Sequence, residues 1–134
     1  MKTLLRLIAL NAILIVCIIS CSKDSGNKPA SERILGVWKL DKAIYHEYIS
    51  GVNYGDTTVG TADDKIEFRS DGNVYTYVQG IYDTSAYSVT SDTKITIDSQ
   101  PYDIQTFTDN ALTIYARLNS GGDDYSEETD YFVK

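Results

Sequence analysis

The residue types that most often do chemistry in proteins are scarce in this chain. It has two cysteines, Cys17 and Cys21, and a single histidine, His46. A Ser-His-acid site would have to use His46, yet the sequence has no Gly-x-Ser-x-Gly nucleophile motif. Zinc sites usually combine several His or Cys ligands. We therefore expect no catalytic residue, no metal site and no cofactor, and we interpret His46 as an exposed residue late in a strand.

Acidic side chains are abundant and fall mostly in short runs, which are Asp63-Asp64, Asp123-Asp124, Glu127-Glu128 and the nearby Asp130. A glycosidase needs two carboxylates set across a cleft, and adjacent acids in loops do not indicate that arrangement. The run Gly121-Gly122-Asp123-Asp124 with Glu127 offers oxygen ligands of the kind that calcium takes. Without the spacing of an EF-hand, a solvated loop is the favoured interpretation.

The first twenty residues differ from the rest of the chain. Lys2 and Arg6 precede an almost unbroken apolar run, Leu7 to Ile19, which is interrupted by Asn11. This run is shorter than the roughly twenty apolar residues that a membrane-spanning helix needs. A positive start, an apolar centre and a small residue before the cleavage site are typical of a secretory signal. We predict that residues 1–20 are a signal peptide.

The segment Ile18-Ile19-Ser20-Cys21 resembles the lipobox of bacterial lipoproteins. The resemblance implies cleavage before Cys21, diacylglycerol on its sulfur and a further acyl chain, such as palmitate, on the new amino group. Two or more acyl chains give stable membrane anchoring where one does not, so the membrane is an expected partner. The alternative is an ordinary signal peptide with a chance cysteine. Ser22 after the cysteine resembles lipoproteins sorted to the outer membrane, at its periplasmic face or at the cell surface.

Loss of the signal peptide changes the inventory of charges and thiols. The whole chain has 12 basic and 19 acidic residues. Removal of Lys2 and Arg6 leaves 10 against 19, a net charge of −9. Such an acidic domain repels phosphate backbones, so we expect no nucleic-acid partner. Cys17 leaves with the signal and Cys21 carries lipid, so no thiol remains for a disulfide or a zinc–thiolate site.

The mature chain divides into a tether and one domain. Residues 21–31 are polar and contain Gly26 and Pro29, which indicates a flexible tether. Residues 32–134 have the size of one ordinary domain, and we expect it to be a monomer. One short helical turn is predicted near residues 31–35.

Alternating, β-branched and aromatic residues then predict an all-β domain. The segment Tyr48–Val59 is either an edge strand or a long loop. Short strands joined by frequent turns indicate a sandwich or a barrel. The eight predicted strands are Gly36–Tyr45, Lys65–Arg69, Val74–Gln79, Ala86–Thr90, Lys94–Asp98, Asp103–Thr108, Leu112–Leu118 and Tyr125–Val133.

Three turns predict the order in which these strands pair. Successive hairpins make a meander, and eight antiparallel strands in a meander close most naturally into an up-and-down barrel without edges. Asp71-Gly72, as a two-residue turn, predicts the pairs Phe68–Tyr75 and Ile66–Tyr77. Ser91-Asp92-Thr93, as a three-residue loop, predicts Val89–Ile95 and Tyr87–Ile97, and Asp109-Asn110 predicts Phe107–Leu112.

The start of the domain, Ile34-Leu35-Gly36-Val37-Trp38-Lys39-Leu40, resembles the Gly-x-Trp opening of lipocalin-like domains. The order of later motifs is also similar to the short lipocalin-like domains of bacterial lipoproteins, as in Ile66-Glu67-Phe68 followed by Asp71-Gly72, Tyr87-Ser88-Val89 and Ile95-Thr96-Ile97. The resemblance implies an eight-stranded barrel that is closed at one end. It implies that Gly36 permits close backbone approach, that Trp38 plugs the closed end and that Arg117 packs on Trp38.

The resemblance also implies a pocket for a small apolar molecule. The inward candidates that could line it are Phe68, Tyr75, Tyr77, Tyr87, Ile97, Leu112 and Ile114. The bulk of these aromatics favours a filled or shallow interior over a deep cavity. Because a buried tyrosine hydroxyl needs a partner, several inward tyrosines also suggest a wet or open end.

Two functions follow from this interpretation. The first is a non-enzymatic, membrane-anchored lipocalin-like lipoprotein that binds a small hydrophobic or amphiphilic molecule at the cell envelope. The alternative is a protein- or glycan-binding accessory lipoprotein with a filled core and a Tyr-rich contact surface, since tyrosine is enriched at interfaces. The tyrosines near the long loops, Tyr45, Tyr48, Tyr54 and Tyr82, are the candidates for that surface.

Overall fold

A computed structural model of the protein describes residues 28–134. The predicted signal peptide, the predicted lipidation site Cys21 and the first part of the predicted tether lie outside the described residues. Within residues 28–134, no helix has the length and apolar character needed to cross a bilayer.

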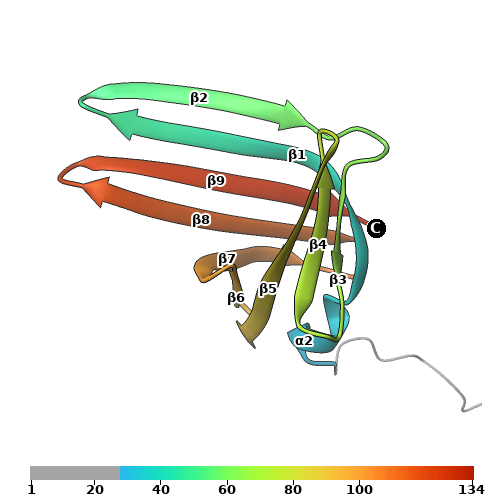
Figure 1. Ribbon diagram of the computed structural model, residues 1–134. Coiled ribbons are helices and arrows are strands. Elements are labelled where there is room, and N and C mark those ends of the chain that lie inside the picture. Colours follow the sequence, from blue (N-terminus) through green and yellow to red (C-terminus); the bar gives the residue numbers. More distant parts are fainter. Residues whose placement is uncertain (1–27) are drawn as a thin grey trace, which may run out of the picture.

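The described chain is almost entirely β-structure (Figure 1). One helical turn precedes nine strands, and every strand is antiparallel to its neighbours. The elements are α2 (Ala30–Arg33), β1 (Gly36–Ile49), β2 (Val52–Val59), β3 (Lys65–Phe68), β4 (Asn73–Val78), β5 (Ile81–Ser91), β6 (Lys94–Ile97), β7 (Gln100–Phe107), β8 (Ala111–Gly121) and β9 (Asp124–Val133).

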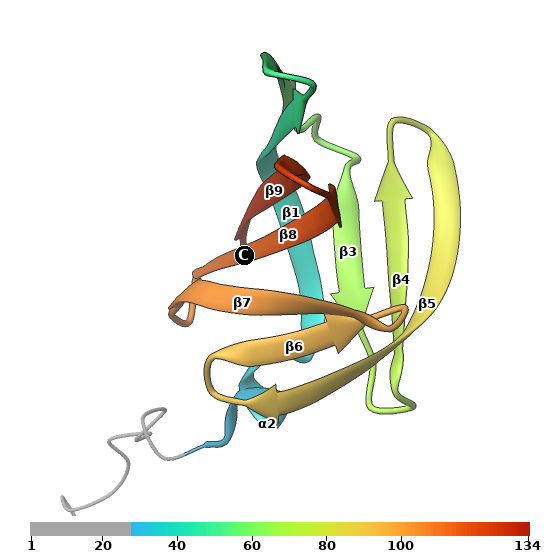
Figure 2. The same cartoon turned by 90° about the vertical axis from the view of Figure 1, so that its left-hand side faces the viewer.

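Eight of the strands form a closed barrel, which confirms the predicted lipocalin-like, up-and-down architecture. The sheet runs β1-β3-β4-β5-β6-β7-β8-β9 and is closed by pairing of β1 with β9 (Figure 2). The first residues of β1, Gly36–Lys39, pair with β3, and Lys39–Tyr48 pair with β9. All of these pairings lie within residues 36–133, so the barrel is complete without the residues outside the description.

Two hairpins extend beyond the barrel, side by side (Figure 1). Strand β2 pairs with the outer part of β1, from Lys42 to Ile49, and so takes the edge-strand role that was one of two predictions for this segment. The outer part of β1 also pairs with β9, and β9 pairs with β8. We call this four-stranded extension, β2-β1-β9-β8, the hairpin sheet. Its tips are joined because the Asp124 carboxylate accepts a hydrogen bond of 2.9 Å from the Ser50 backbone N–H.

The β3–β4 hairpin differs from the prediction by one residue. Phe68 pairs with Val74 and not with Tyr75. The loop has three residues, 70–72, since the Arg69 N–H donates to the Asn73 carbonyl at 3.0 Å and Gly72 has a φ of +82°. This is a type I turn followed by a left-handed residue. A slip of one residue turns the whole of β4 over, so its tyrosines face outward.

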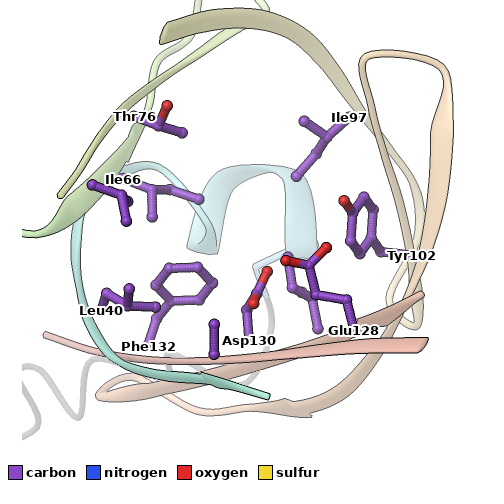
Figure 3. A pocket seen from close by; sticks show the side chains of 11 residues that line it. Leu40, Ile66, Thr76, Ile97, Tyr102, Glu128, Asp130 and Phe132 are labelled. Atoms are coloured by element: carbon purple, nitrogen blue, oxygen red, sulfur yellow. The ribbon is translucent and has the colours of Figure 1, made fainter. Parts of the chain in front are cut away.

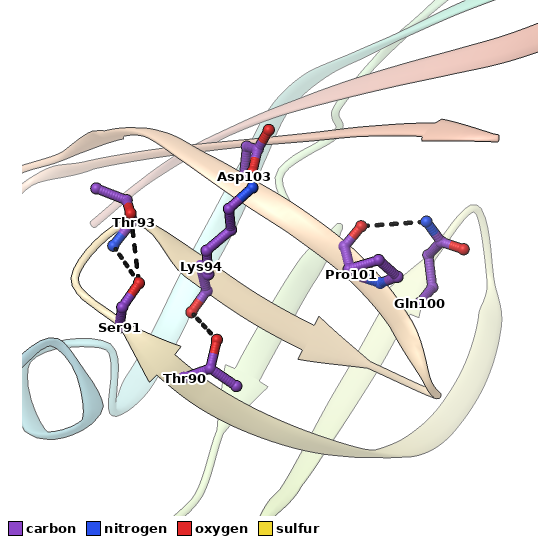
Figure 4. A network of polar contacts seen from close by, with 7 residues as sticks. All are labelled: Thr90, Ser91, Thr93, Lys94, Gln100, Pro101 and Asp103. Atoms are coloured by element: carbon purple, nitrogen blue, oxygen red, sulfur yellow. Dashed lines mark hydrogen bonds and ion pairs between the residues drawn. The ribbon is translucent and has the colours of Figure 1, made fainter.

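The other two predicted hairpins have the predicted pairs. Val89 pairs with Ile95, Tyr87 with Ile97, and Phe107 with Leu112. The loop between β5 and β6 is one residue shorter than predicted, because a register shift between Val89 and Ser91 takes up Thr90. Thr90 Oγ1 donates to the Lys94 carbonyl at 3.4 Å, and the Lys94 ammonium forms an ion pair with Asp103 on β7 (Figure 4).

The core is concentrated at the end of the barrel beside α2. Trp38, Phe68, Val74, Ile95 and Leu112 are at most 1 % exposed there. Ala30 is also buried, and its backbone N–H donates to the Asp92 carboxylate at 3.3 Å. Residues 30 and 31, predicted as the last of the flexible tether, are therefore the start of α2 and part of the folded domain.

Trp38, to which the resemblance gives the role of a plug, is fully buried at this end, but two of its expected neighbours behave differently. The indole Nε1–H of Trp38 donates to the Ile34 carbonyl at 2.7 Å. Gly36 opens β1 with a φ of +107°, and a Cβ placed there would meet no atom within 4 Å. Glycine is therefore needed at position 36 for its positive φ, and not because another chain segment approaches it closely.

Arg117 does not pack on Trp38; that expectation is wrong. Its guanidinium lies 3.9 Å from the ring centroid of Tyr125, far along the hairpin sheet. The cations at the closed end come from the chain segments that frame it. Lys134 Nζ lies 4.2 Å from the Trp38 ring centroid, and the Arg33 guanidinium lies 4.3 Å from that of Phe107.

Candidate ligand cavity

The barrel is not completely filled. A cavity of about 200 Å³ lies between the closed end and the hairpin sheet, partly open to solvent. Figure 3 views it with α2 behind it, so the closed end forms its floor. Its walls are supplied by seven of the eight barrel strands, as the lining residues Leu40, Ala43, Ile66, Thr76, Val78, Ile97, Tyr102, Ile114, Glu128, Asp130 and Phe132 show.

Two of the seven predicted lining residues, Ile97 and Ile114, do border the cavity. Three others belong to the packed interior. Phe68 and Leu112 are buried in the core. Tyr87 packs its ring edge-on to Phe68 at 4.9 Å, and its hydroxyl donates to the Arg69 carbonyl at 2.8 Å. The filled part of the interior is therefore the end that these side chains occupy.

The remaining two predicted lining residues, Tyr75 and Tyr77, are on the outside of the barrel. The ring of Tyr77 lies 4.3 Å from that of Tyr82, and the Arg69 guanidinium lies 4.1 Å from the ring of Tyr75. The β4 positions that face the cavity are Thr76 and Val78. The register of the β3–β4 loop is the cause of this exchange.

Two carboxylates project into the cavity from one strand. Glu128 and Asp130 are two residues apart on β9, so they share a face and their Cβ atoms lie about 7 Å apart. The deeper neighbour on this face is Phe132, which pairs with Leu40, whereas Glu128 pairs with the exposed Tyr45. The acids thus stand between an apolar floor and the open end. Tyr102 on β7 lines the same cavity (Figure 3).

Within residues 28–134, neither acid forms an ion pair. Among the described residues, none of those lining the cavity is a lysine or an arginine. Within the same part of the chain, no hydrogen bond or ion pair links either carboxylate to another side chain. By contrast, Glu127, the neighbour on the opposite face of β9, accepts from the Tyr115 hydroxyl at 2.7 Å and from Arg117 at 3.2 Å.

Burial without a partner changes the acidity of all three groups. Burial, and secondly the charge of Glu128, raises the pKa of Asp130 from 3.8 to about 7. Burial also raises the pKa of Glu128. The pKa of the Tyr102 hydroxyl rises to about 12, through burial first and then through the charges of Glu128 and Asp130. Desolvation disfavours the charged form of each acid.

The inner face of the hairpin sheet continues the cavity wall toward solvent. By the register of β1 with β2 and β9, Ala43, Tyr45 and Glu47 share this face with Tyr54 and with Glu128. Leu118 on β8 lies on it too, opposite Ser126. Tyr45, Tyr54 and Leu118 are 41 %, 57 % and 51 % exposed. Exposed aromatic and aliphatic side chains therefore lead out from the mouth of the cavity, on a face that also carries Glu47 and Asp56.

Sequence reasoning missed Glu128 and Asp130 as interior residues, although a signal was present. The last strand was predicted over Tyr125–Val133, and Phe132 is its evident core residue. Strict alternation from Phe132 puts Asp130 and Glu128 on the core face. The adjacent acids of this segment were instead interpreted as solvated charges.

The other residues considered for chemistry are dispersed. His46 is exposed on the outer face of the hairpin sheet, opposite Gly55 and Glu127. In the part of the chain that the structure describes, no three His, Cys, Asp or Glu side chains are grouped so as to hold a metal ion. Neither the comparison with models of known protein families nor the search of curated proteins finds a match for this chain.

Proposed function

We propose that this protein is a lipid-anchored, non-enzymatic lipocalin-like protein of the cell envelope whose barrel binds a small apolar or amphiphilic molecule. The observation that carries the binding function is the cavity of about 200 Å³ walled by aliphatic side chains. A largely apolar pocket with a few convergent polar groups is typical of small-molecule sites. Its size compares with the engineered cavity of about 150 Å³ that takes up benzene.

The anchoring function rests on the sequence of the first 21 residues, with its positive start, apolar centre and lipobox-like Ile18-Ile19-Ser20-Cys21. The geometry of the barrel adds a direction. The described chain enters at α2, beside the closed end (Figure 1), whereas the lining of the cavity extends from that end toward the hairpin sheet. An anchor preceding α2 would therefore attach to the end of the barrel opposite the mouth, which leaves the mouth accessible to molecules in the aqueous phase.

Ligand binding is tested by native mass spectrometry of the chain from Ser22, purified from its own host. This chain retains all the strand pairings of the barrel. We expect a co-purifying small-molecule mass. Ala43→Phe, which fills the cavity from β1, should abolish it, while Ala86→Phe on the exposed face of β5 should not. An empty protein that also leaves small apolar probes unbound would contradict the proposal.

Anchoring is tested by metabolic labelling of the full chain with an alkyne analogue of palmitate. Cys21→Ser should remove the label. Cys17→Ser is the matched control, four residues earlier in the predicted signal peptide, and should keep it. Labelling that survives Cys21→Ser would contradict lipid attachment at Cys21, but it would not bear on the proposed ligand binding.

One observation favours the alternative function of a protein- or glycan-binding accessory. The hairpin sheet exposes Tyr45 and Tyr54 on its inner face, and Tyr48 stacks on Tyr125 at 5.6 Å on its outer face. Exposed aromatic surface of this kind is common at binding sites. On this alternative, Tyr54→Ala would weaken binding to an envelope partner, whereas Ala43→Phe would have no effect.

A further inference from the structure

We propose that the molecule bound in the cavity is a small cationic amphiphile, an ammonium group on an apolar body, and that its charge pairs with Asp130 and Glu128. The inference rests on the proposed ligand-binding function and narrows it to one class of ligand. It excludes the fatty acids and other anionic lipids that an apolar barrel could otherwise accept.

Glu128 and Asp130 are two partly buried carboxylates without a charged partner among the described residues. Burying a carboxylate without a partner is unfavourable, and proteins normally pair such groups or bind a cation with them. Glu128 and Asp130 line the cavity without a lysine or arginine among its described lining residues. On the opposite face of the same strand, Glu127 has both a phenol and a guanidinium. Among the described residues, the acid that faces away from the cavity therefore has protein partners, whereas the two that face into it have none.

The position of the acids matches an amphiphile. Deeper than Asp130 the walls are Leu40, Ile66 and Phe132, and nearer the mouth Glu128 adjoins Tyr45. A compact apolar group fits the floor, with its ammonium at the level of the carboxylates. A second apolar branch can leave along the exposed side chains of Tyr45 and Leu118 on the hairpin sheet. An ammonium has up to three donors, which suits a cavity wall that presents two carboxylates from one face of a strand.

Other ligand charges fit less well. An anion would lie against two acids, and like charges repel. A divalent metal ion would need a third ligand, and among the described residues no group of three His, Cys, Asp or Glu side chains exists. A neutral alcohol can donate one hydrogen bond, but it cannot compensate the charge. This difference between an alcohol and an ammonium makes the inference testable.

The probes are 2-phenylethylamine, its neutral isostere 2-phenylethanol and the anion 3-phenylpropionate, titrated into the chain from Ser22 with ¹³C-labelled isoleucine methyl groups. Ile66, Ile97 and Ile114 report on the cavity, while Ile49 and Ile81, at 41 % and 69 % exposure, serve as internal controls. At pH 8 we expect the cavity methyls to shift and the amine to bind at least about tenfold more tightly than the alcohol. We expect no binding of the anion.

The affinity for the amine should also depend on pH. The titratable groups that face Asp130 are Glu128 on β9, Tyr102 on β7 and, nearer the mouth, Tyr45 on β1; β8 presents Ile114, and His46 lies on the other face. With a pKa of about 7, Asp130 is mostly neutral at pH 5 and mostly charged at pH 8. An alkylammonium stays protonated over this range. Its affinity should therefore rise by about tenfold or more from pH 5 to pH 8, and that of the alcohol should not.

Asp130→Asn removes the charge and keeps the shape. We expect this variant to lower the affinity for the amine at least about tenfold at pH 8 and to change the affinity for the alcohol by less than about threefold. The pH dependence of the affinity for the amine should disappear. Glu127→Gln, on the outer face of the same strand, should change neither affinity. Far-UV circular dichroism confirms that each variant is folded.

The outcomes separate this inference from the proposed function. Equal binding of the amine and the alcohol, or an unchanged preference in Asp130→Asn, would overturn the cationic ligand and leave the apolar cavity as a binding site. If no probe moves the cavity methyls at either pH, both the inference and the ligand-binding function fail. Tighter binding of 3-phenylpropionate than of the amine would reverse the inference.

Discussion

The two ends of this barrel are made from the same strands but use their polar groups in opposite ways. At the closed end, the indole N–H of Trp38 has the Ile34 carbonyl as its acceptor, and Lys134 covers its ring. At the open end, β9 turns Glu128 and Asp130 into an apolar cavity where no cation of the described lining meets them. Partial burial of a carboxylate without a partner of opposite charge costs free energy. The comparison teaches that the closed end maintains the barrel and that the open end is arranged for something that binds.

The largest effect should come from the closed end. Trp38→Ala removes a fully buried indole and should lower the free energy of unfolding by about 3–5 kcal/mol, through lost apolar burial and the cavity left behind. Urea denaturation followed by far-UV circular dichroism measures this, since the variant has no tryptophan to report by fluorescence. Tyr82→Ala, at a position that is 79 % exposed, should cost less than about 1 kcal/mol. A similar loss of unfolding free energy in the two variants would contradict the idea that the closed end is the stabilising region.

The open end should respond in the opposite direction. Because the pKa of Asp130 in the folded protein, about 7, exceeds its ordinary 3.8, the unfolded chain ionises first as the pH rises. The folded protein therefore loses stability between about pH 4 and pH 7 and recovers none above it. Asp130→Asn should be neutral near pH 4 and stabilising by a few kcal/mol, at most about 4, at pH 8.

Urea denaturation at the two pH values checks this prediction. The matched control is Asp103→Asn, which breaks the exposed ion pair with Lys94 and should change stability by less than about 0.5 kcal/mol. If Asp130→Asn destabilised the protein at pH 8, the carboxylate would have a favourable partner, and the contrast between the ends would be lost.

The accuracy of the sequence-based predictions differs between the two ends for physical reasons. The Gly-x-Trp resemblance rests on residues within one turn and one strand, and Trp38, to which it gives the plugging role, is fully buried. Strand β4 was assigned the wrong face because both of its faces are apolar, with Val74 and Val78 on one and Tyr75 and Tyr77 on the other. Its pattern could not reveal that the loop has three residues and not two.

The cavity acids were missed for a different reason. Charged residues in short runs are usually solvated, and Glu127-Glu128 followed by Asp130 has that composition. Only the barrel brings Tyr102 and Ile97 from β7 and β6 over the same space, so no local pattern shows that the two acids share a cavity. The sequence did not decide the structure of residues 48–59 in the hairpin sheet either, because their pattern was compatible with both an edge strand and a long loop.

A smaller effect tests which cation supports the closed end. Arg33→Ala removes a hydrogen bond of 3.0 Å to the Phe107 carbonyl and a guanidinium stacked on that ring. We expect a loss of about 1–2 kcal/mol in the free energy of unfolding. Arg117→Ala, in the exposed hairpin sheet, should cost about 0.5 kcal/mol or less, although the lipocalin-like resemblance gave Arg117 the closing role. The reverse order of the two losses would contradict the stabilising role of Arg33 at the closed end.

The smallest effect concerns the coupling between the two cavity acids. Burial is the larger cause of the raised pKa of Asp130, and the charge of Glu128 is the smaller. Glu128→Gln should therefore lower the pKa of Asp130 below about 7 but leave it well above 3.8. Carboxyl ¹³C chemical shifts across a pH titration measure it. Glu127→Gln removes the same charge from the adjacent residue on the outer face, where it is paired with Tyr115 and Arg117, and should leave the titration of Asp130 unchanged. Equal shifts in the two variants would mean that Asp130 senses the net charge of the strand and not a neighbour inside the cavity.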